Sequence, residues 1–309
     1  MSEESLSSCT AIGIEVNASD CIGVCIGSDG AIIASDRAPI ANAEDSITEL
    51  CNFAGQLKSK FGSAERIGIA LPGLIRRETG RVDYSARIPS HVGVDIAKQI
   101  KSCTGVNAVL ENDANAAAFA EYKLGAGRGS KHMFYATIGT GIGGAFIFDG
   151  RVWHGAAGFA GEFGYVAVNS DGMRLEDVAS AENIVRRTRA RFHQDNTSSL
   201  NKLDEQAITI DDILNAATAE DDFARLMLER TGNYIGTAVA SVINLLNIET
   251  IVIGGPIMQA GNVLLNAIVR SARELSFAPS FESTLILAGE LGERAPACGA
   301  ALLAAESAR

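Results

Sequence analysis

Short apolar segments separated by polar turns make up the beginning of the chain. Residues 10–17, 21–27 and 31–36 are rich in Ile, Val, Ala and Cys, and the turns between them contain Asn-Ala-Ser-Asp and Ser-Asp-Gly. Apolar segments of this length, bounded by turn-forming residues, predict a three-stranded antiparallel meander.

The rest of the chain alternates between the helical and the strand period. Helices are predicted over residues 43–60, 95–103, 114–125, 181–191, 210–218, 221–246, 261–275 and 296–307. Further strands are predicted over residues 66–73, 106–111, 249–255 and 283–289.

The segment that begins near residue 132 repeats the N-terminal organisation. Residues 132–138 and 142–148 again form two apolar strands, with a glycine-containing turn between them and an Asp-Gly turn after them. Two meander-plus-helix units in one chain indicate a duplicated α/β fold. We expect a ligand cleft between the two halves.

Composition and charge exclude several classes of protein. The chain has 309 residues, 47% of them hydrophobic and 20% charged, as in a globular protein with a large core. Its net charge of −11 argues against a nucleic-acid surface, since phosphate contacts need clustered Lys and Arg. The clustered Arg186, Arg187, Arg189 and Arg191 are interpreted as a solvated helix face. No apolar segment reaches the length of about 18 residues that a membrane span needs.

The N-terminus and the cysteines favour a cytoplasmic protein. The sequence begins MSEESLSSCT, which is acidic and polar, whereas a signal peptide begins basic and continues apolar. The six cysteines are scattered and resemble neither a disulfide framework nor a Cys-x-x-Cys metal-binding pair. This usage suits a reducing compartment.

The stretch IGTGIGGAFI, residues 138–147, contains the spacing Gly-x-Gly-x-x-Gly. A dinucleotide-binding turn requires a helix directly after the glycines, whereas AFIFDGRVW here predicts a strand, which excludes that interpretation. A wide hairpin with glycine bulges remains one alternative. The number of glycines, which cost backbone entropy, and the hydroxyl of Thr140 favour a hairpin whose backbone N–H groups bind phosphate.

Glu111, Asn112 and Asp113 end a predicted strand and begin a predicted helix. Asp113 in this position fits a helix N-cap. Two carboxylates and an amide at the carboxyl end of a strand also fit a site for a polyol. The residues alone leave both interpretations open.

Three motifs, IGTGIGGAF, ENDANAAAFAEY and GAAGFAGEFG, resemble the ROK family of sugar kinases and related repressors. That resemblance implies two actin-like ATPase (ribonuclease H-like) domains with a ligand cleft between them. Residues 1–113 would form the smaller domain, completed by residues 295–309, and residues 114–294 the larger domain.

The same resemblance implies roles for individual residues. Asp113 would be the catalytic base that accepts the proton of the attacking sugar hydroxyl. The sugar would be bound by Gly73, Asn112, Glu162, Tyr165 and Glu176. The nucleotide and its phosphates would be bound by Glu15, Ser19, Gly139, Thr140, Gly141, Gly143, Gly254 and Gly255, with Mg²⁺ held by Glu15 through water. Without the resemblance, GAAGFAGEFGY fits a tight turn and Gly254-Gly255 fits a strand-to-helix turn with a packing role.

The sequence departs from the family pattern at three places. Tyr165 stands where the family often has a His followed by zinc-binding cysteines, and VNSDGMRLEDVAS offers no Cys or His, so no zinc site is expected. Arg87 stands where an Asn often contacts the sugar. The first phosphate loop, an acid followed by any residue and Gly-Gly-Thr in the family, reads Glu15-Val16-Asn17-Ala18-Ser19 here, which weakens the expected hold on phosphate.

Two functions follow from these patterns. The first is a glucokinase-like sugar kinase that uses ATP and Mg²⁺, and the second is a non-catalytic sugar-binding sensor or regulatory protein. A DNA-binding repressor is disfavoured because only about ten residues precede the first strand. The expected partners are a small-molecule sugar and a nucleotide, with no nucleic acid and no membrane, in a homodimer.

Overall fold

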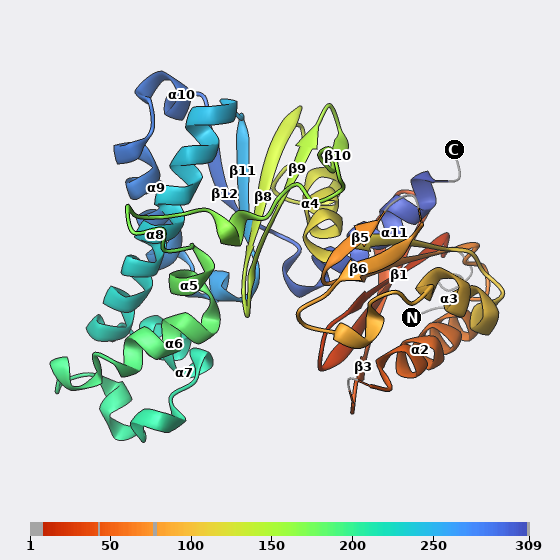
Figure 1. The fold of residues 1–309 in the computed structure, drawn as a ribbon, viewed down its shortest axis with the longest axis horizontal. Helices are drawn as coiled ribbons and strands as arrows, with labels where there is room; N and C mark the ends of the chain where they lie inside the picture. Colours follow the sequence, from red (N-terminus) through yellow and green to blue (C-terminus); the bar gives the residue numbers. More distant parts are fainter. Residues whose placement is uncertain (1–8, 43, 77–78, 308–309) are drawn as a thin grey trace. The chain divides into compact units, whose positions relative to one another are not determined.

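The computed structural model describes residues 9–42, 44–76 and 79–307, which form two compact units (Figure 1). Unit 1 holds the described residues of 1–129, 145–160 and 291–309, and unit 2 holds 130–144 and 161–290.

The described residues form two five-stranded sheets, and the two sheets have the same strand order. The first runs β3-β2-β1-β4-β7 and the second β10-β9-β8-β11-β12. The first contains β1 (Ala11–Val16), β2 (Asp20–Ile26), β3 (Ile32–Pro39), β4 (Arg66–Leu71) and β7 (Ala108–Asn112). The second contains β8 (His132–Ile138), β9 (Ile142–Phe148), β10 (Arg151–Trp153), β11 (Thr250–Gly254) and β12 (Leu285–Ala288).

The shared order confirms the predicted duplicated α/β fold. In each sheet an antiparallel meander is extended by two parallel strands. A separate hairpin of β5 (Leu74–Arg76) and β6 (Arg81–Tyr84), which the sequence pattern did not predict, follows β4.

Helices cover both faces of the first sheet (Figure 1). Buried side chains of β1 alternate, so that Ile12, Ile14 and Val16 join the core formed with α2 (Ser46–Lys60) and α3 (Ile96–Thr104). Ala11 faces the opposite way and joins the core formed with α4 (Asp113–Leu124) and α11 (Ala295–Glu306).

The packing of α11 assigns α4 to unit 1. A Cβ at Gly299 would overlap the backbone of Ala116, so the two helices approach each other closely. The division into compact units therefore differs from the expected boundary between residues 113 and 114, because the whole of α4 packs with the C-terminal helix.

The helices of unit 2 lie beside the second sheet (Figure 1). They are α5 (Glu176–Ala179), α6 (Ala181–Arg189), α7 (Ile210–Thr218), α8 (Asp222–Leu246), α9 (Asn262–Leu275) and α10 (Ala278–Glu282). Short 3₁₀ helices in the chain are η1 (Pro89–His91), η2 (Phe163–Tyr165), η3 (Phe192–Gln194), η4 (Ser199–Lys202), η5 (Glu205–Ala207), η6 (Pro256–Ala260) and η7 (Gly292–Arg294).

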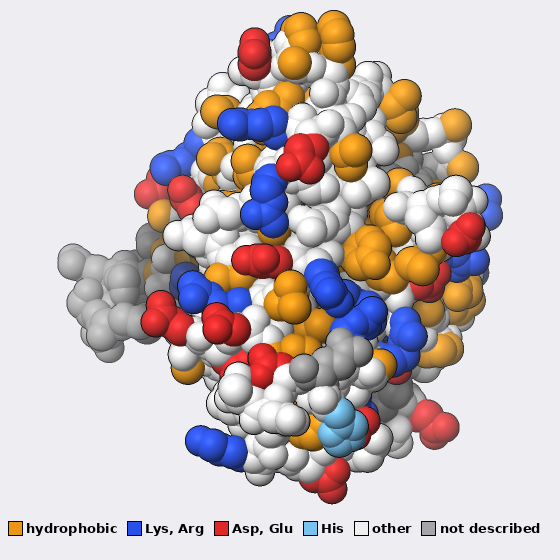
Figure 2. Space-filling view, turned by 90° about the vertical axis from the view of Figure 1, so that its left-hand side faces the viewer, with side chains coloured by type: hydrophobic (Ala, Val, Ile, Leu, Met, Phe, Trp, Pro, Cys, Tyr) orange, Lys and Arg blue, Asp and Glu red, His pale blue; other side chains and the backbone are white. Residues whose placement is uncertain are grey.

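The arginines of α6 hold the helix against its neighbours. The guanidinium of Arg187 donates to Thr231 of α8 and lies over the ring of Tyr234, and Arg189 donates to the carbonyl oxygen of Ile208 at 2.7 Å. These contacts refine the expectation of a solvated helix face. On the face that Figure 2 presents, side chains of both charges are interspersed. Among the helices described, none has the length and apolar character needed to cross a bilayer.

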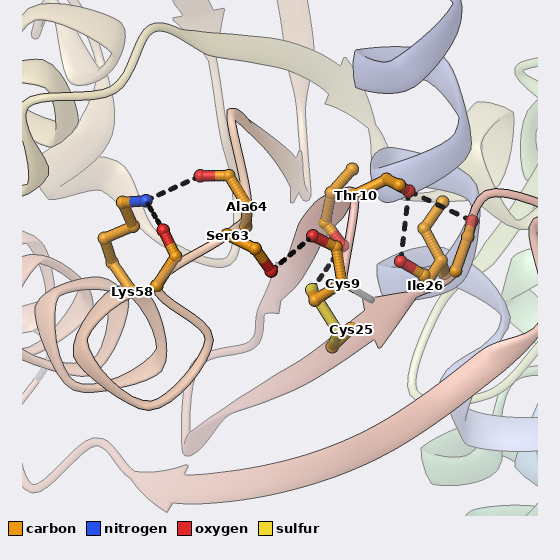
Figure 3. Close-up of a disulfide and its surroundings, with 10 residues drawn as sticks. Cys9, Thr10, Cys25, Ile26, Lys58, Ser63 and Ala64 are labelled. Carbon is orange, nitrogen blue, oxygen red and sulfur yellow. Dashed lines mark hydrogen bonds between the residues drawn. A yellow bond between two sulfur atoms is a disulfide. The ribbon is translucent and has the colours of Figure 1, made fainter. Parts of the chain in front are cut away.

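A disulfide joins Cys9 to Cys25 of β2, with their Cα atoms 5.9 Å apart (Figure 3). The hydroxyl of Thr10 donates to the carbonyl oxygen of Ile26 at 3.1 Å, and Ser63 donates to that of Cys9 at 2.9 Å. The sequence pattern gave no sign of this bond, because the β1–β2 hairpin brings together two cysteines that are 16 positions apart.

His91 is a buried titratable group in unit 1. Its Nε2 lies 2.9 Å from the hydroxyl of Ser46, and its Nδ1 has no hydrogen-bond partner among the described residues. Burial lowers the pKa of His91 from 6.5 to about 4. The charged imidazolium is therefore disfavoured in the folded protein.

We expect the protein to lose stability in acid through His91. Because the pKa is lower in the folded chain than in the unfolded one, the contribution of the neutral imidazole is complete above pH 6.5. It is lost as the pH falls from 6.5 toward 4, by at most about 3 kcal/mol. Urea unfolding of the wild type and His91→Gln should show a stability difference that shrinks over this range. Parallel pH profiles would contradict the assignment.

Candidate functional site

The carboxyl ends of three parallel strands bring several candidate residues together in unit 1. The register aligns Glu15 of β1 with Ala70 of β4, and Ala70 with Glu111 of β7. The chain continues from these strands into the β1–β2 turn, the β4–β5 loop with Gly73, and the start of α4. Open α/β sheets bind ligands at such an edge.

The junction of β7 and α4 separates the roles of Asn112 and Asp113. Asn112 is the N-cap, and its Oδ1 accepts the backbone N–H of Asn115 at 3.1 Å. The alternative interpretation of Asp113 as the N-cap is therefore wrong, because Asp113 is the first residue of the helix. Its Oδ1 accepts a local bond from the backbone N–H of Ala114 at 2.9 Å.

Asn112 also bridges two strand ends. Its Nδ2 donates to the carbonyl oxygen of Gly73 at 3.1 Å. Both ends of the amide thus have partners within the protein, and the predicted contact of Asn112 with a sugar has to share them.

Two carboxyl groups at this edge have pKa values above their ordinary range. Burial, followed by the nearby carboxylates of Asp113 and Asp20, raises the pKa of Glu15 to about 8. Burial also raises the pKa of Asp113, and the guanidinium of Arg87 acts in the opposite direction. The edge therefore holds acidic groups whose charge would be offset by a bound cation.

These groups fit Mg²⁺ held indirectly. Carboxylate oxygen is the donor type that Mg²⁺ prefers, and Mg²⁺ usually keeps several waters and binds substrate phosphates. Within the described part of the chain, no three His, Cys, Asp or Glu side chains converge as a metal-ligand set. A single carboxylate such as Glu15 acting through water agrees with both observations.

The β1–β2 turn does not need glycine to form. The N–H of Asn17 donates to the carbonyl oxygen of Asp20 at 2.8 Å, and the carbonyl oxygen of Ser19 accepts the N–H of Ile40. Asn17, Ala18 and Ser19 all have negative φ. The backbone conformation is thus compatible with these residues, and the side chains of Asn17 and Ala18 distinguish the turn sterically from a glycine loop.

The glycine stretch forms the predicted hairpin between β8 and β9. The N–H of Gly139 donates to the carbonyl oxygen of Gly141 at 3.0 Å, while Thr140 is exposed at the tip and Gly143 lies in β9. The carbonyl oxygen of Gly139 accepts the N–H of Ala181, the first residue of α6, at 2.8 Å. The hairpin is therefore anchored on one side to a helix N-terminus.

Glu176 anchors the other side of this hairpin. Its Oε2 accepts the backbone N–H of Ile142 at 2.8 Å. The sugar contact of Glu176 stays a prediction, and the structure gives this carboxylate a partner in the backbone of the hairpin.

A second glycine turn lies next to the hairpin in unit 2. Gly254 and Gly255 connect β11 to η6, and Gly255 has a φ of 90°. A Cβ at Gly255 would overlap the backbone of Ile138, and one at Gly139 would lie 3.2 Å from the ring of Pro256. This close approach supports the packing interpretation of the pair and brings the two glycine turns side by side.

Glu162 and Tyr165 flank η2 at the surface of unit 2. Glu162 is the N-cap of this helix, and the guanidinium of Arg174 lies 4.6 Å from the centre of the exposed Tyr165 ring. The segment that follows is closed as a hairpin by hydrogen bonds from Val168 to Met173 and from Leu175 to Val166. Backbone hydrogen bonds thus hold the segment in which the family often has zinc ligands.

One residue at the unit 1 edge, His154, was not among the predicted site residues. Its Nε2 lies 2.9 Å from Oε2 of Glu111, and both side chains are largely buried. Nothing in the sequence around His154 predicts its contact with Glu111, because this contact depends on the position of β10 beside α4.

Comparison with known proteins gives consistent matches along the chain. The sequence model of the ROK family matches residues 11–307. A glucokinase of Halalkalibacterium halodurans is 34% identical over 250 residues, which are 77% of this chain and 73% of that protein. The DNA-binding transcriptional repressor Mlc of Escherichia coli is 27% identical over 268 residues, which are 83% of this chain and 64% of the repressor.

A solved structure covers nearly the whole fold. The ROK family glucokinase of Streptomyces griseus, determined in complex with glucose and AMPPNP, matches with a TM-score of 0.86 and 25% identity. The match covers 96% of this chain and 99% of that chain.

Gly255→Ala should destabilise the protein more than the same change at Gly172. Both glycines have positive φ, but a Cβ at Gly172 would have no atom within 4 Å, whereas one at Gly255 would meet backbone. We expect a loss of about 1–2 kcal/mol at Gly172 from backbone strain alone and a clearly larger loss at Gly255. Chemical denaturation of both variants measures this difference. Equal losses would show that the close approach at Gly255 is relieved at little cost.

The chain should keep its stability without zinc. The hairpin after Tyr165 is closed by backbone hydrogen bonds rather than by metal ligands. Metal analysis of the purified protein should give much less than one zinc per chain, and EDTA should leave the melting temperature unchanged. Stoichiometric zinc, or a large fall in melting temperature with EDTA, would refute this expectation.

Proposed function

The chain belongs to the ROK family, and we propose that it is a glucokinase-like sugar kinase, which transfers the terminal phosphoryl group of ATP to a hydroxyl of a hexose or hexose-like substrate. The observation that carries this proposal is the position of Asp113. Its carboxyl group lies at the carboxyl edge of the first sheet and is not used as the cap of α4.

Asp113 would act as the base in this reaction. Phosphoryl transfer is mainly a matter of positioning and charge stabilisation, so the carboxylate needs to orient the attacking hydroxyl and accept its proton. The raised pKa of Asp113 increases its proton affinity. Gly73 and Asn112 flank it and would bind other hydroxyls of the sugar. In unit 2, the proposed sugar-binding residues are Glu162, Tyr165 and Glu176.

The glycine turns of unit 2 would bind the nucleotide. Backbone N–H groups of the Gly139–Gly141 hairpin would donate to phosphate oxygens, with the Thr140 hydroxyl as a further donor. The hydrogen bond from Ile142 to Glu176 would keep the hairpin rigid. Gly143, Gly254 and Gly255 would complete this surface, and the AMPPNP complex of the Streptomyces griseus relative supports the use of ATP.

Mg²⁺ would be bound near Glu15 through water, with Ser19 beside it. When bound, this ion offsets the negative charge of the phosphate oxygens. The chain's own contribution is a carboxyl group whose pKa is raised by burial and by neighbouring acids, so that a cation beside it would favour its ionised form.

A non-catalytic sugar-binding sensor is the second candidate. It is favoured by Asn17, Ala18 and Ser19 in the first phosphate loop, and by the similarity to the repressor Mlc. A sensor would bind sugar without consuming ATP, so measurements of turnover separate the two functions.

The direct test is a coupled assay of ADP release with Mg-ATP and a panel of hexoses, amino sugars and cyclitols. The kinase predicts sugar-dependent ADP release with at least one member of the panel. Sugar binding by calorimetry without any ADP release would establish the sensor instead.

Asp113→Asn should abolish turnover without weakening the fold. Asn retains the shape but cannot accept the hydroxyl proton, so kcat should fall about 10²–10⁴-fold. Since Asp113 is not the helix cap and its charged form is disfavoured by burial, the unfolding free energy should not fall.

Asp95→Asn is the matched control for this variant. Asp95 caps α3 by accepting the N–H of Lys98, and Asn is also a good N-cap residue. Its kcat should equal that of the wild type. If Asp113→Asn keeps more than about a tenth of the wild-type kcat, Asp113 is not the base.

A further inference from the structure

A buried hydrogen bond links the end of β7 to the segment that follows β10. The Nε2 atom of His154 lies 2.9 Å from Oε2 of Glu111, and only 11% and 12% of the two side chains are exposed. Both residues belong to unit 1. A hydrogen bond shielded from water in this way is costly to break, because each partner would be left desolvated and unpaired.

Glu111 is hydrogen-bonded at both carboxylate oxygens. While Oε2 faces His154, Oε1 accepts the backbone N–H of Asn112 and the side-chain amide of Asn115, each at 3.0 Å. Burial acts to raise the pKa of Glu111, but the hydrogen bonds from His154, Asn115 and Asn112 outweigh it and lower the pKa. An ionised carboxylate only accepts hydrogen bonds, so Nε2 of His154 carries the proton that is shared.

The same hydrogen bonds fix the first turn of α4. Asn112 caps this helix and donates to Gly73, so a continuous chain of bonds runs from Gly73 through Asn112 and Glu111 to His154. Asp113 follows Asn112 directly and begins the helix. Through these hydrogen bonds, the imidazole of His154 can affect the position of Asp113 by way of Glu111 and the helix backbone.

We propose that His154 is a positioning residue for phosphoryl transfer: by holding Glu111, it keeps the first turn of α4 and the base Asp113 in place. This inference rests on the proposed kinase function. Without the imidazole, Oε2 of Glu111 would lose its partner in a buried place. The carboxyl would then take up a proton or turn toward water, and its bonds to Asn112 and Asn115 would weaken.

The kinetic test compares His154→Leu with the conservative His154→Gln. Leu removes the donor, whereas Gln keeps an N–H group that can reach Glu111. A small displacement of a catalytic group is expensive, so kcat should fall about 10–100-fold in the Leu variant while the sugar dissociation constant changes little. The Gln variant should recover most of kcat.

Further variants distinguish the positioning role of His154 from a general effect of replacing a histidine. His193 pairs with Glu205 at 3.3 Å on the surface and is 82% exposed, so His193→Leu should leave kcat unchanged. Glu111→Gln should also lower kcat, and the Glu111→Gln/His154→Leu double variant should lose less than the product of the two single effects, because both act through one bond.

Hydrogen exchange tests the positioning independently of turnover. Amides in the first turn of α4, residues 112–116, should exchange faster in His154→Leu than in the wild type or His193→Leu. Unchanged hydrogen exchange in this turn would overturn the inference. This holds even if the wild type is a sensor without kinase activity, because the measurement does not depend on turnover. In an active wild type, a kcat of His154→Leu within about twofold of normal would overturn it as well. The absence of ADP release from the wild type contradicts only the kinase function.

Discussion

Helix α11 approaches β1, β4 and α4 so closely that three glycine positions leave no space for a side chain. A Cβ at Gly13 of β1 would overlap Ala297, one at Gly68 of β4 would overlap Ala300, and one at Gly299 would overlap Ala116 of α4. The whole edge of unit 1 depends on this contact, because it fixes where α4 begins relative to the strands. Interiors are packed too tightly to absorb an added methyl group at such a point without a shift of the backbone.

The three acids at this edge have opposite electrostatic surroundings. Glu111 is paired with His154 and its pKa lies below the ordinary value, whereas the pKa values of Glu15 and Asp113 lie above it. Groups whose surroundings shift their pKa values apart commonly have different tasks. Here the fully hydrogen-bonded carboxylate supports the structure, whereas in the proposed kinase the two carboxyl groups with raised pKa values would act on the ligands.

The longer elements could be predicted from sequence because local pattern and tertiary packing agree in them. The segments 132–138 and 142–148 became β8 and β9 with the same bounds, since both are short apolar segments bounded by turn residues and both are largely buried in the sheet. The short strands β5, β6 and β10 were missed because three or four residues contain too little periodicity. Pairing with a neighbour decides their conformation.

Candidate residues were predictable where they belong to a contiguous motif and not where they depend on long-range contacts. The Glu111-Asn112-Asp113 motif was found from the sequence. The residues alone did not decide whether Asp113 caps the helix or belongs to a ligand site, because only the backbone angles show that Asn112 is the cap. The disulfide of Cys9 and the pairing of His154 were missed for a similar reason. Each links residues that are distant in sequence and are brought together by a hairpin or by a neighbouring helix.

The contact of α11 also orders events during synthesis. The core on this face of the first sheet contains Ala297, Cys298, Ala300 and Ala301, which follow the whole of unit 2 in the chain. The strands of unit 1 are made first, yet the part of this face that carries Gly13 and Gly68 stays uncovered until α11 leaves the ribosome. The first sheet therefore completes its core only after unit 2 has been synthesised. A nascent chain that stops short of α11 cannot form the packing of α11 against α4, the helix that begins with Asp113.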